Sequence, residues 1–168
     1  IYKAMEEKGL NARVYRLGRI TGRCTDHVFQ RNPESNAAYL MMRAVRALGA
    51  ITESMSLLPV DLTPVDWCAA AVAALSGSDR TALHLLNPQP PSMKEVAQAL
   101  VPDLVIVPDE SYGMLLQERM NEENRDILAP LLDYYNRTGI GESRIQVDCS
   151  KTLPKFKKEG FGWEIPPA

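Results

Sequence analysis

The chain has 168 residues, about the size of one domain; 45% of them are apolar and 24% are charged. This composition is typical of a soluble globular protein and excludes a disordered tail, a collagen-like fibre and a coiled coil. With 19 basic and 21 acidic side chains the net charge is −2, so the chain lacks the basic excess that nucleic-acid binding needs. No apolar run reaches the length of about 18 residues that would predict a membrane span.

The beginning of the chain is predicted to be the end of a helix, followed by a strand. In residues 1–9 the apolar side chains share one face, and Gly9 supplies a left-handed stop. No capping residue precedes this helix, as we expect if its start has been cut away. Residues 11–17 are predicted to form a strand and residues 18–23 a loop.

A strongly periodic helix comes next. Ser35 or Asn36 is expected to cap it, and Gly49 is expected to end it. Its apolar positions follow a spacing of three and four residues: Ala37, Leu40, Met41, Ala44, Val45 and Leu48.

A short strand around residues 57–62 is predicted to lead into a second well-marked helix. Thr63 is the expected N-cap, Pro64 occupies the first turn, and Asp66 is expected to serve as a capping carboxylate. Gly77 is expected to stop this helix.

The second half continues the alternation of strands and helices. Residues 82–86 are predicted to form a strand, and Ser92 with Glu95 forms the capping box of a helix to about residue 100. Pro130 is expected to bend a later helix or to shift its start. The remaining predicted elements are a strand at 104–107, helices at 110–120 and 123–137, a strand at 145–148, a helix at 150–159 and a tail at 160–166. This alternation predicts the α/β or α+β class.

The cysteines indicate neither a disulfide framework nor a metal site. Cys24, Cys68 and Cys149 are odd in number and widely spaced, which is typical of free thiols in a reducing cytoplasm. Only His27 and His84 could join them as ligands, and the spacing of a zinc site is missing. We therefore expect no metal.

The chain also lacks a complete catalytic motif. It has no Gly-x-Gly-x-x-Gly turn for a dinucleotide and no phosphate-binding loop. It has no Tyr-x-x-x-Lys pair, in which lysine lowers the pKa of tyrosine so that the phenol can pass a proton to a carbonyl. Tyr39 and Arg43 have that spacing, but arginine is a poor substitute for lysine. His84 lies in a predicted apolar strand, where a structural role is expected. The sequence thus predicts no catalytic residue.

Three stretches, in order, resemble one family. Residues 9–22 contain the run Tyr-Arg-Leu-Gly-Arg-Ile-Thr-Gly, residues 61–69 the run Thr-Pro-Val-Asp-Trp-Cys-Ala, and residues 148–163 an Asp-Cys-Ser-Lys-Thr run and a Gly-Phe-Gly-Trp run. Together they are similar to the C-terminal part of extended short-chain dehydrogenase/reductases. The likeness is greatest to the thioester reductase domains that end nonribosomal peptide synthetases and occur in carboxylic acid reductases. Leu17 departs from the family pattern, which usually has proline there, and so does Cys24, where a small polar residue is common.

The resemblance implies a fold and a division of the chain. Residues 1–23 would be the end of a Rossmann-fold helix with its strand and loop, and residues 24–168 a mixed α/β substrate-binding lobe. The catalytic Tyr-x-x-x-Lys and the glycine-rich cofactor turn would lie upstream of Ile1. This part alone is then expected to be inactive and to bind no cofactor tightly.

The resemblance also implies an activity for the complete enzyme. NADPH would reduce the thioester of an acyl or peptidyl chain held on the phosphopantetheine arm of a carrier protein, which would release an aldehyde or alcohol. The expected cofactor residues are Leu17, Gly18, Arg19 and Ile20. Gly18 could allow close approach of the cofactor or could serve the turn alone. Arg19 could face a phosphate or the carrier protein, or could be a solvated surface residue.

The expected substrate residues lie in a loop and on the periodic helix. They are Phe29, Gln30, Asn36, Tyr39, Leu40 and Arg43. The pair Met41 and Met42 would suit an adaptable apolar pocket, but methionine at helical spacing is more often part of a helix core.

Two other interpretations stay open. The chain could be the matching lobe of a sugar-nucleotide epimerase or dehydratase, although only scattered basic residues such as Arg43 and Arg46 are available for a diphosphate. It could also be a non-enzymatic docking module for a carrier protein. Because the strand at 12–17 would lack its neighbour in the sheet, we expect either self-association through this region or displacement of residues 1–17 from their native path.

Overall fold

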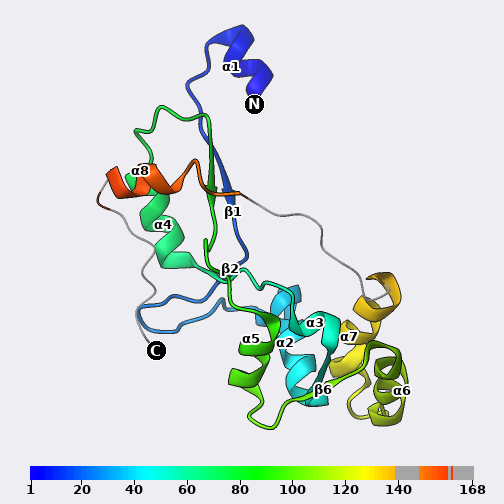
Figure 1. Cartoon of the computed structure of the whole chain (residues 1–168). Helices are drawn as coiled ribbons and strands as arrows, with labels where there is room; N and C mark the ends of the chain where they lie inside the picture. Colours follow the sequence, from blue (N-terminus) through cyan, green and yellow to red (C-terminus); the bar gives the residue numbers. More distant parts are fainter. Residues whose placement is uncertain (139–147, 159, 161–168) are drawn as a thin grey trace. The chain divides into compact units, whose positions relative to one another are not determined.

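The protein is described from a computed structural model, which covers residues 1–138, 148–158 and 160. Two compact units make up the chain, and both are discontinuous in sequence (Figure 1). The first unit contains residues 1–30, 61–89 and the described residues from 148 onward, and the second contains residues 31–60 and 90–138. The division at residue 23 that the family resemblance implies stays a prediction.

The first unit is built around two parallel strands. Its elements are α1 (Tyr2–Lys8), β1 (Val14–Leu17), β2 (Ile20–Thr21), β4 (Thr63–Pro64), α4 (Val65–Ala74), β5 (Ala82–Leu85) and α8 (Leu153–Lys158). β1 pairs with β5 in parallel, from Val14 opposite Ala82 to Leu17 opposite Leu85. β2 pairs with β4 in parallel, with Ile20 opposite Thr63. In the described part of the chain, β5 is the only strand that pairs with β1.

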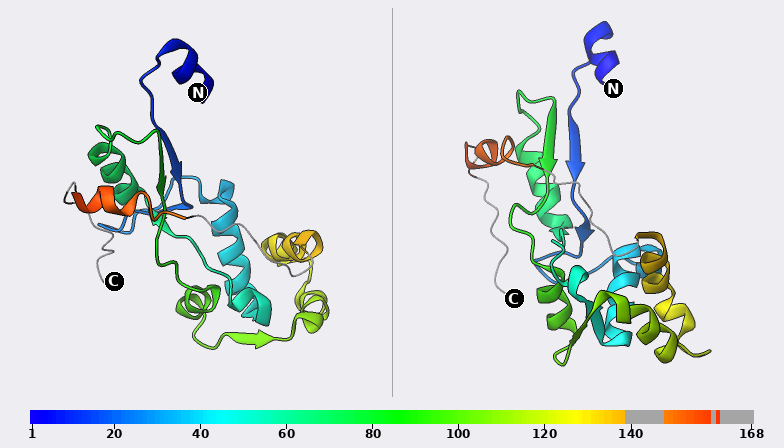
Figure 2. Two further views of the ribbon diagram at one scale, coloured as in Figure 1. Left: turned by 45° about the horizontal axis from the view of Figure 1, so that its top comes forward. Right: turned by 45° about the vertical axis from the view of Figure 1, so that its right-hand side comes forward.

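Buried side chains alternate along β5, so one face of the β1–β5 pair packs against an apolar core. Leu83 and Leu85 are buried, and α4 and α8 lie beside the strands in both views of Figure 2. The rings of Trp67 on α4 and Phe156 on α8 meet edge to face, with centroids 5.4 Å apart. The two helices therefore cover this face of the β1–β5 pair.

The N-terminal helix is confirmed, including its stop. α1 ends at Gly9, whose φ of 63° lies in the left-handed region that glycine adopts without penalty. None of the seven residues of α1 is buried. Packing within the described part of the chain therefore contributes little to this helix.

The second unit is mainly helical. It contains a 3₁₀ turn (Pro33–Ser35), α2 (Ala37–Leu48), β3 (Ala50–Thr52), α3 (Glu53–Ser56), α5 (Met93–Leu100), β6 (Val105–Val107), α6 (Asp109–Arg119) and α7 (Arg125–Thr138). Its buried side chains include Val45 on α2, Leu116 on α6, and Leu128 and Leu131 on α7.

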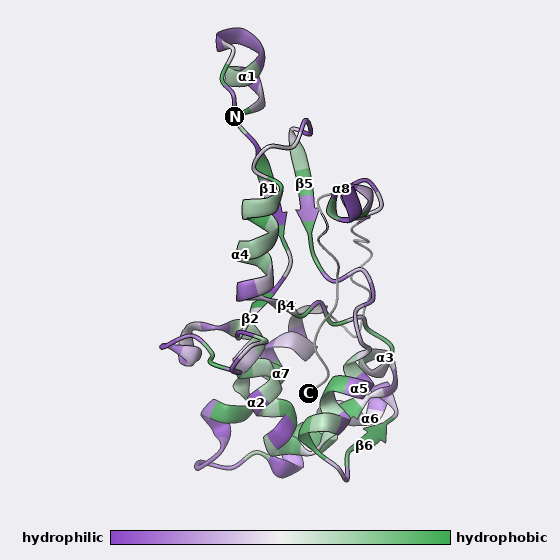
Figure 3. Ribbon diagram, turned by 90° about the vertical axis from the view of Figure 1, so that its left-hand side faces the viewer, coloured by the Kyte–Doolittle hydropathy of each residue, from purple (hydrophilic) through white to green (hydrophobic). Residues whose placement is uncertain are grey.

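A parallel strand pair also lies in this unit. β3 is buried along its whole length and pairs with β6. Figure 3 colours β6 as hydrophobic, although Val105 is 55% exposed and Ile106 is 37% exposed. Among the described residues β6 is thus an edge strand with partly uncovered apolar side chains.

The ends of the periodic helix α2 match the prediction. Asn36, not Ser35, is the N-cap, and its side-chain oxygen accepts the backbone N–H groups of Ala38 and Tyr39 at 3.0 and 3.1 Å. Gly49 ends the helix with a φ of 72°.

The strand predicted at residues 57–62 is wrong. The chain forms the buried strand β3 and the short helix α3 before it, and only Pro59 makes an isolated bridge, with Ser92. Thr52 caps α3 by accepting the N–H of Met55 at 3.0 Å. A three-residue buried strand has no alternation to detect, so these elements carried no clear sequence signal.

The predicted ends of α4 are also wrong. Thr63 does not cap the helix, because it lies in β4 and is fully buried, and the N-cap is Pro64. The helix ends at Ala74 with Leu75 as C-cap, before Gly77. Asp66 accepts hydrogen bonds chiefly from another segment, described below, so its predicted role as a capping carboxylate is incomplete.

The remaining predicted elements within the described residues are confirmed, with small shifts in their ends. They are β5, α5 with its Ser92–Glu95 capping box, β6, α6, α7 and α8. Pro130 lies inside α7, which begins at Arg125 rather than at 123. The strand predicted at 145–148 and the tail from 161 lie outside the described residues, apart from Asp148. Among the described residues, no helix combines the length and the apolar character that crossing a membrane requires.

Candidate functional site

The loop between β1 and β2 lies where two parallel strands end. We use the name β1–β2 loop for residues 17–20, which are the predicted cofactor residues. The N–H of Gly18 donates to the carbonyl of Leu85, the last residue of β5, at 2.7 Å. Because β1 and β5 are parallel, their carboxyl ends meet at one edge. In α/β proteins this edge is where ligands commonly bind.

One carboxylate ties this loop to two other segments. Asp61 Oδ2 accepts the backbone N–H of Arg19 at 2.9 Å. Asp61 Oδ1 accepts the hydroxyl of Thr63 at 2.9 Å and the backbone N–H of Asn87, just beyond β5, at 3.3 Å. Thr63 in turn donates its N–H to the carbonyl of Arg19 at 2.9 Å. Asp61 therefore joins the β1–β2 loop, the start of β4 and the end of β5.

Packing against Asp61 explains the glycine in the loop. A Cβ at Gly18 would lie 2.1 Å from Asp61 Oδ2 and 2.4 Å from Thr63 Oγ1. Real side chains do not approach so closely, so position 18 requires glycine as long as Asp61 occupies this place. Gly18 is not among the described glycines with a positive φ, so the turn alone does not require glycine here, and packing against Asp61 is a third explanation. Close approach of a cofactor at Gly18 stays a prediction.

The side chains of the loop differ in exposure. Leu17 is 48% exposed and Arg19 is exposed, whereas Ile20 is partly buried against the core of α4 and β5. An apolar side chain and a guanidinium at this edge fit the nicotinamide and a phosphate of a dinucleotide, respectively. The role of the loop at one end of such a cofactor stays a prediction, and the described residues offer no glycine-rich turn for the pyrophosphate.

A second loop, residues 22–29, is held by Asp66. Asp66 Oδ1 accepts the N–H of Cys24 at 3.1 Å, Oδ2 accepts the N–H of Thr25 at 3.2 Å, and the Cys24 thiol lies 3.4 Å from both oxygens. Partial desolvation acts to raise the pKa of Asp66, but the hydrogen bonds from Cys24 and Thr25 outweigh it and hold the pKa well below the ordinary value. Desolvation and the neighbouring carboxylate raise the pKa of the Cys24 thiol. Asp66 is therefore an anion that fixes a loop, and Cys24 stays a neutral thiol.

Phe29 is the last residue of this second loop, and Gln30 follows it. Phe29 is partly buried, and its ring lies 3.4 Å from where a Cβ at Gly22 would stand, while Gln30 is exposed. The N–H of Arg23 donates to the carbonyl of Val28 at 3.0 Å, which closes the loop just before Phe29.

The other predicted substrate residues belong to the second unit. Asn36, Tyr39, Leu40 and Arg43 lie on the first two turns of α2 or cap it. The amide oxygen of Asn36 is used in the cap, whereas Tyr39 is 37% exposed and Arg43 is exposed. The six predicted substrate residues thus divide between the two units, and a common substrate site remains a prediction.

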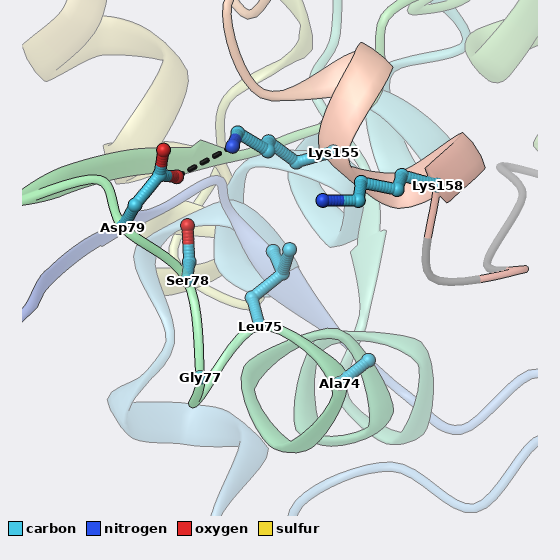
Figure 4. A pocket seen from close by; sticks show the side chains of 7 residues that line it. All are labelled: Ala74, Leu75, Gly77, Ser78, Asp79, Lys155 and Lys158. Carbon is cyan, nitrogen blue, oxygen red and sulfur yellow. Dashed lines mark hydrogen bonds and ion pairs between the residues drawn. The ribbon is translucent and has the colours of Figure 1, made fainter.

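A pocket of about 200 Å³ lies elsewhere in the first unit (Figure 4). Lys155 on α8 reaches across it to Asp79 at 2.5 Å, and this hydrogen bond lowers the pKa of Asp79. Lys158 also lines the pocket. None of its residues was predicted as a site residue, and its polar walls are typical of a solvated surface.

The cysteines are free, as predicted. Cys68 and Cys149 are buried, and desolvation raises the pKa of both thiols. The described residues contain no group of three or more His, Cys, Asp or Glu side chains that could hold a metal ion.

Sequence reasoning missed Asp61. Its partners lie 42 positions upstream at Arg19 and 26 positions downstream at Asn87. Only its place two residues before Thr63, in the second stretch that resembles the family, could have drawn attention to it.

The arrangement defines a class of fold. Parallel strand pairs end at a loop held by a partly buried hydrogen-bond network, and the chain order alternates strands and helices, as in mixed α/β proteins. A scan against protein-family models finds no match, and a search of curated proteins finds none either.

Solved structures do share this fold. The thiolation-reductase di-domain of an archaeal non-ribosomal peptide synthetase matches 94% of this chain with a TM-score of 0.77 and 24% identity. The reductase domain of the Aureusimine biosynthetic cluster matches 99% with a TM-score of 0.77 and 23% identity. The terminal R domain of the myxalamid PKS-NRPS biosynthetic pathway matches 99% with a TM-score of 0.74 and 23% identity.

The chain spans only part of each of these structures, namely 33%, 44% and 42% of their lengths. Its fold is therefore that of a part of such reductase domains, as the family resemblance implied.

Proposed function

We propose that this chain is the C-terminal part of an NAD(P)H-dependent thioester reductase that releases an acyl or peptidyl chain from a carrier protein. The observation that carries the proposal is the fold shared with three reductase domains over 94–99% of the chain. The three sequence stretches that resemble the same family, found in the same order along the chain, support it independently. The epimerase and docking-module interpretations have no comparable support.

In the complete enzyme the β1–β2 loop would meet the nicotinamide end of the cofactor. NADPH, when bound, supplies hydride to the thioester carbonyl carbon. The carbon–sulfur bond would then break, and the proton that the upstream tyrosine is expected to supply would go to the sulfur. The products would be an aldehyde, the thiol of the phosphopantetheine arm and NADP⁺. Leu17 would cover the ring with its exposed side chain, and Arg19 would face a phosphate or the carrier protein.

The residues of the second loop and of α2 would bind the substrate. Phe29, Leu40 and Tyr39 offer apolar and aromatic surface for an acyl chain, while Gln30 and Arg43 offer polar groups for its amides. The enzyme would work in the cytoplasm, where carrier proteins and reduced cofactor are available. Without the upstream half, the open edge of β1 would favour self-association, which light scattering of the 168-residue chain measures.

The test uses the chain joined to the upstream sequence of its gene. The joined protein is mixed with NADPH and a carrier protein loaded with an acyl-phosphopantetheine thioester. NADPH oxidation is followed by absorbance, and the aldehyde or alcohol by mass spectrometry. We expect turnover by the joined protein and none by residues 1–168 alone.

Two results would overturn the proposal. The first is an upstream sequence without Tyr-x-x-x-Lys within about ten residues of Ile1, the length of two to three helical turns. The second is a folded joined protein that neither oxidises NADPH with any loaded carrier nor binds the carrier.

A further inference from the structure

We propose that Asp61 is a positioning residue for the cofactor, which acts by holding the β1–β2 loop in one conformation. This inference rests on the proposed function, because it takes the loop as the nicotinamide end of the site. It adds a residue that does not itself contact the cofactor but determines where the loop lies.

Both carboxylate oxygens of Asp61 accept hydrogen bonds, and their donors lie in different segments. Oδ2 accepts the N–H of Arg19, and Oδ1 accepts the Thr63 hydroxyl and the Asn87 N–H. The three donors come from segments far apart in the sequence, so no local turn could hold them together. A carboxylate that accepts several N–H and O–H groups makes stronger bonds than a neutral acceptor would.

Strand pairing holds the two ends of the loop, with Leu17 opposite Leu85 and Ile20 opposite Thr63, so Asp61 acts on the two residues between them. Beyond Asp61, the backbone of Gly18 and Arg19 is held by the Leu85 carbonyl and by the Thr63 N–H. Gly18 also rests directly against the Asp61 carboxylate, since no Cβ could fit between them. Loss of the carboxylate would remove both the hydrogen bond to Arg19 and the surface on which Gly18 packs.

A change in the position of the loop would affect the rate of hydride transfer. Hydride transfer depends on the placement of the reacting atoms, and a misplacement of about 1 Å can cost about 100-fold in rate. Leu17 and Arg19 flank Gly18, so a shift of Gly18 moves both side chains that would meet the cofactor. Asp61 therefore affects catalysis through geometry.

The test compares Asp61→Asn with the matched control Asp79→Asn. In Asp61→Asn an amide NH₂ replaces one oxygen and faces an N–H or O–H donor, so at least one of the three bonds is lost. Asp79 is also a hydrogen-bonded aspartate of the first unit, but its partner is Lys155, outside the loop. Thr63→Val is a milder variant that keeps the buried volume and removes only one donor, should Asp61→Asn fail to fold.

The first readout is amide hydrogen exchange in the 168-residue chain. We expect the N–H of Arg19, the N–H of Asn87 or both to exchange about tenfold faster or more in Asp61→Asn, according to which carboxylate oxygen the NH₂ group replaces, and less so in Thr63→Val. The N–H of Leu75 donates to the carbonyl of Ala71, and its exchange rate should be unchanged in Asp61→Asn. In Asp79→Asn the exchange rates of Arg19, Asn87 and Leu75 should all be unchanged. Unchanged exchange at Arg19 and Asn87 would overturn the inference.

The second readout uses the joined protein with NADPH and a loaded carrier. We expect weaker NADPH binding in a fluorescence titration, a fall in kcat of about tenfold or more, and a larger isotope effect with NADPH deuterated at the nicotinamide C4. Simple loss of folded protein would lower kcat without changing KM or the isotope effect.

The outcomes separate the two proposals. Faster exchange with unchanged KM, kcat per folded molecule and isotope effect would overturn the role of Asp61 and leave the thioester reductase function standing. An inactive wild-type joined protein would overturn the proposed function, and with it the role of Asp61 toward a cofactor.

Discussion

Gly18→Ala is the sharpest test of the packing at the end of β1. The added methyl group would lie 2.1 Å from Asp61 Oδ2, and an ordinary contact begins near 3.4 Å. The carboxylate or the loop must therefore move by roughly 1.3 Å. Thr63 Oγ1, which a Cβ would meet at 2.4 Å, blocks a small sideways shift. The clash thus involves both the carboxylate and a buried hydroxyl.

The expected cost follows from two contributions. Overpacking a well-filled site costs about 1–3 kcal/mol, and displacing Asp61 Oδ2 weakens its hydrogen bond to Arg19 by about 1 kcal/mol. We expect Gly18→Ala to lower the free energy of unfolding by about 3 kcal/mol in total.

Urea unfolding of the 168-residue chain measures this cost. Trp67 lies in the core of the first unit, so its fluorescence reports on that unit once Trp163 is replaced by phenylalanine. Gly77→Ala is the matched control, because a Cβ there meets no described atom within 4 Å and its φ is not in the left-handed region. It should change the free energy of unfolding by less than about 0.5 kcal/mol.

A Gly18→Ala chain as stable as the Gly77→Ala chain would refute the reasoning. Gly18 would then not be in contact with Asp61, and the explanation of this glycine by internal packing would fail.

Three further predictions concern other residues. The hydroxyl of Tyr112 is buried without a partner among the described residues, so Tyr112→Phe should leave the free energy of unfolding unchanged or raise it by about 1 kcal/mol. Tyr15→Phe loses a hydrogen bond of 3.2 Å to the Leu75 carbonyl and should lower the free energy of unfolding by about 1 kcal/mol. Thermal unfolding of both variants checks this, and equal losses would contradict it. The folded-state pKa of Asp66 is depressed, so its contribution to stability is present at neutral pH and is lost as the pH falls below the ordinary value of about 4. The urea midpoint of the wild type should therefore fall more between pH 6 and pH 3, a range chosen around that value, than the midpoint of Asp66→Asn, and parallel curves would count against the prediction. Ser92→Ala removes half of a capping box and should cost about 1 kcal/mol, as measured by urea unfolding against Ser76→Ala, a residue outside any cap; no difference between the two would show that the box does not stabilise α5.

Long helices with clear ends could be predicted from the sequence alone. For α2 the apolar spacing, a polar cap and a final glycine all lie within about 14 consecutive residues, so the signal is local. The same holds for the capping box of α5. Prediction failed where an element was too short to give a pattern, or where its sequence was also typical of another structure. β3 is a three-residue buried strand, and Thr63 had the sequence context of a cap although its hydroxyl is bonded to Asp61.

The candidate site could also be predicted only in part. The resemblance in residues 9–22 identified the β1–β2 loop, but only the structure assigned its glycine to internal packing against Asp61. The predicted substrate residues divide between two units, because Phe29 precedes and Asn36 follows the point where the chain passes from one unit to the other.

The sequence by itself determined the class of the protein, its periodic helices, its free cysteines and the family that it resembles. These depend on local spacing and on residue types, which are present in the chain before it folds. Only the tertiary structure decided that Asp61 joins the β1–β2 loop, β4 and the end of β5, and that Asp66 holds the loop at Cys24. The reason is physical: apart from the bond between Asp61 and Thr63, two positions away, these bonds join groups 26 to 42 positions apart, and nothing in the local sequence encodes which distant donors will meet a given carboxylate.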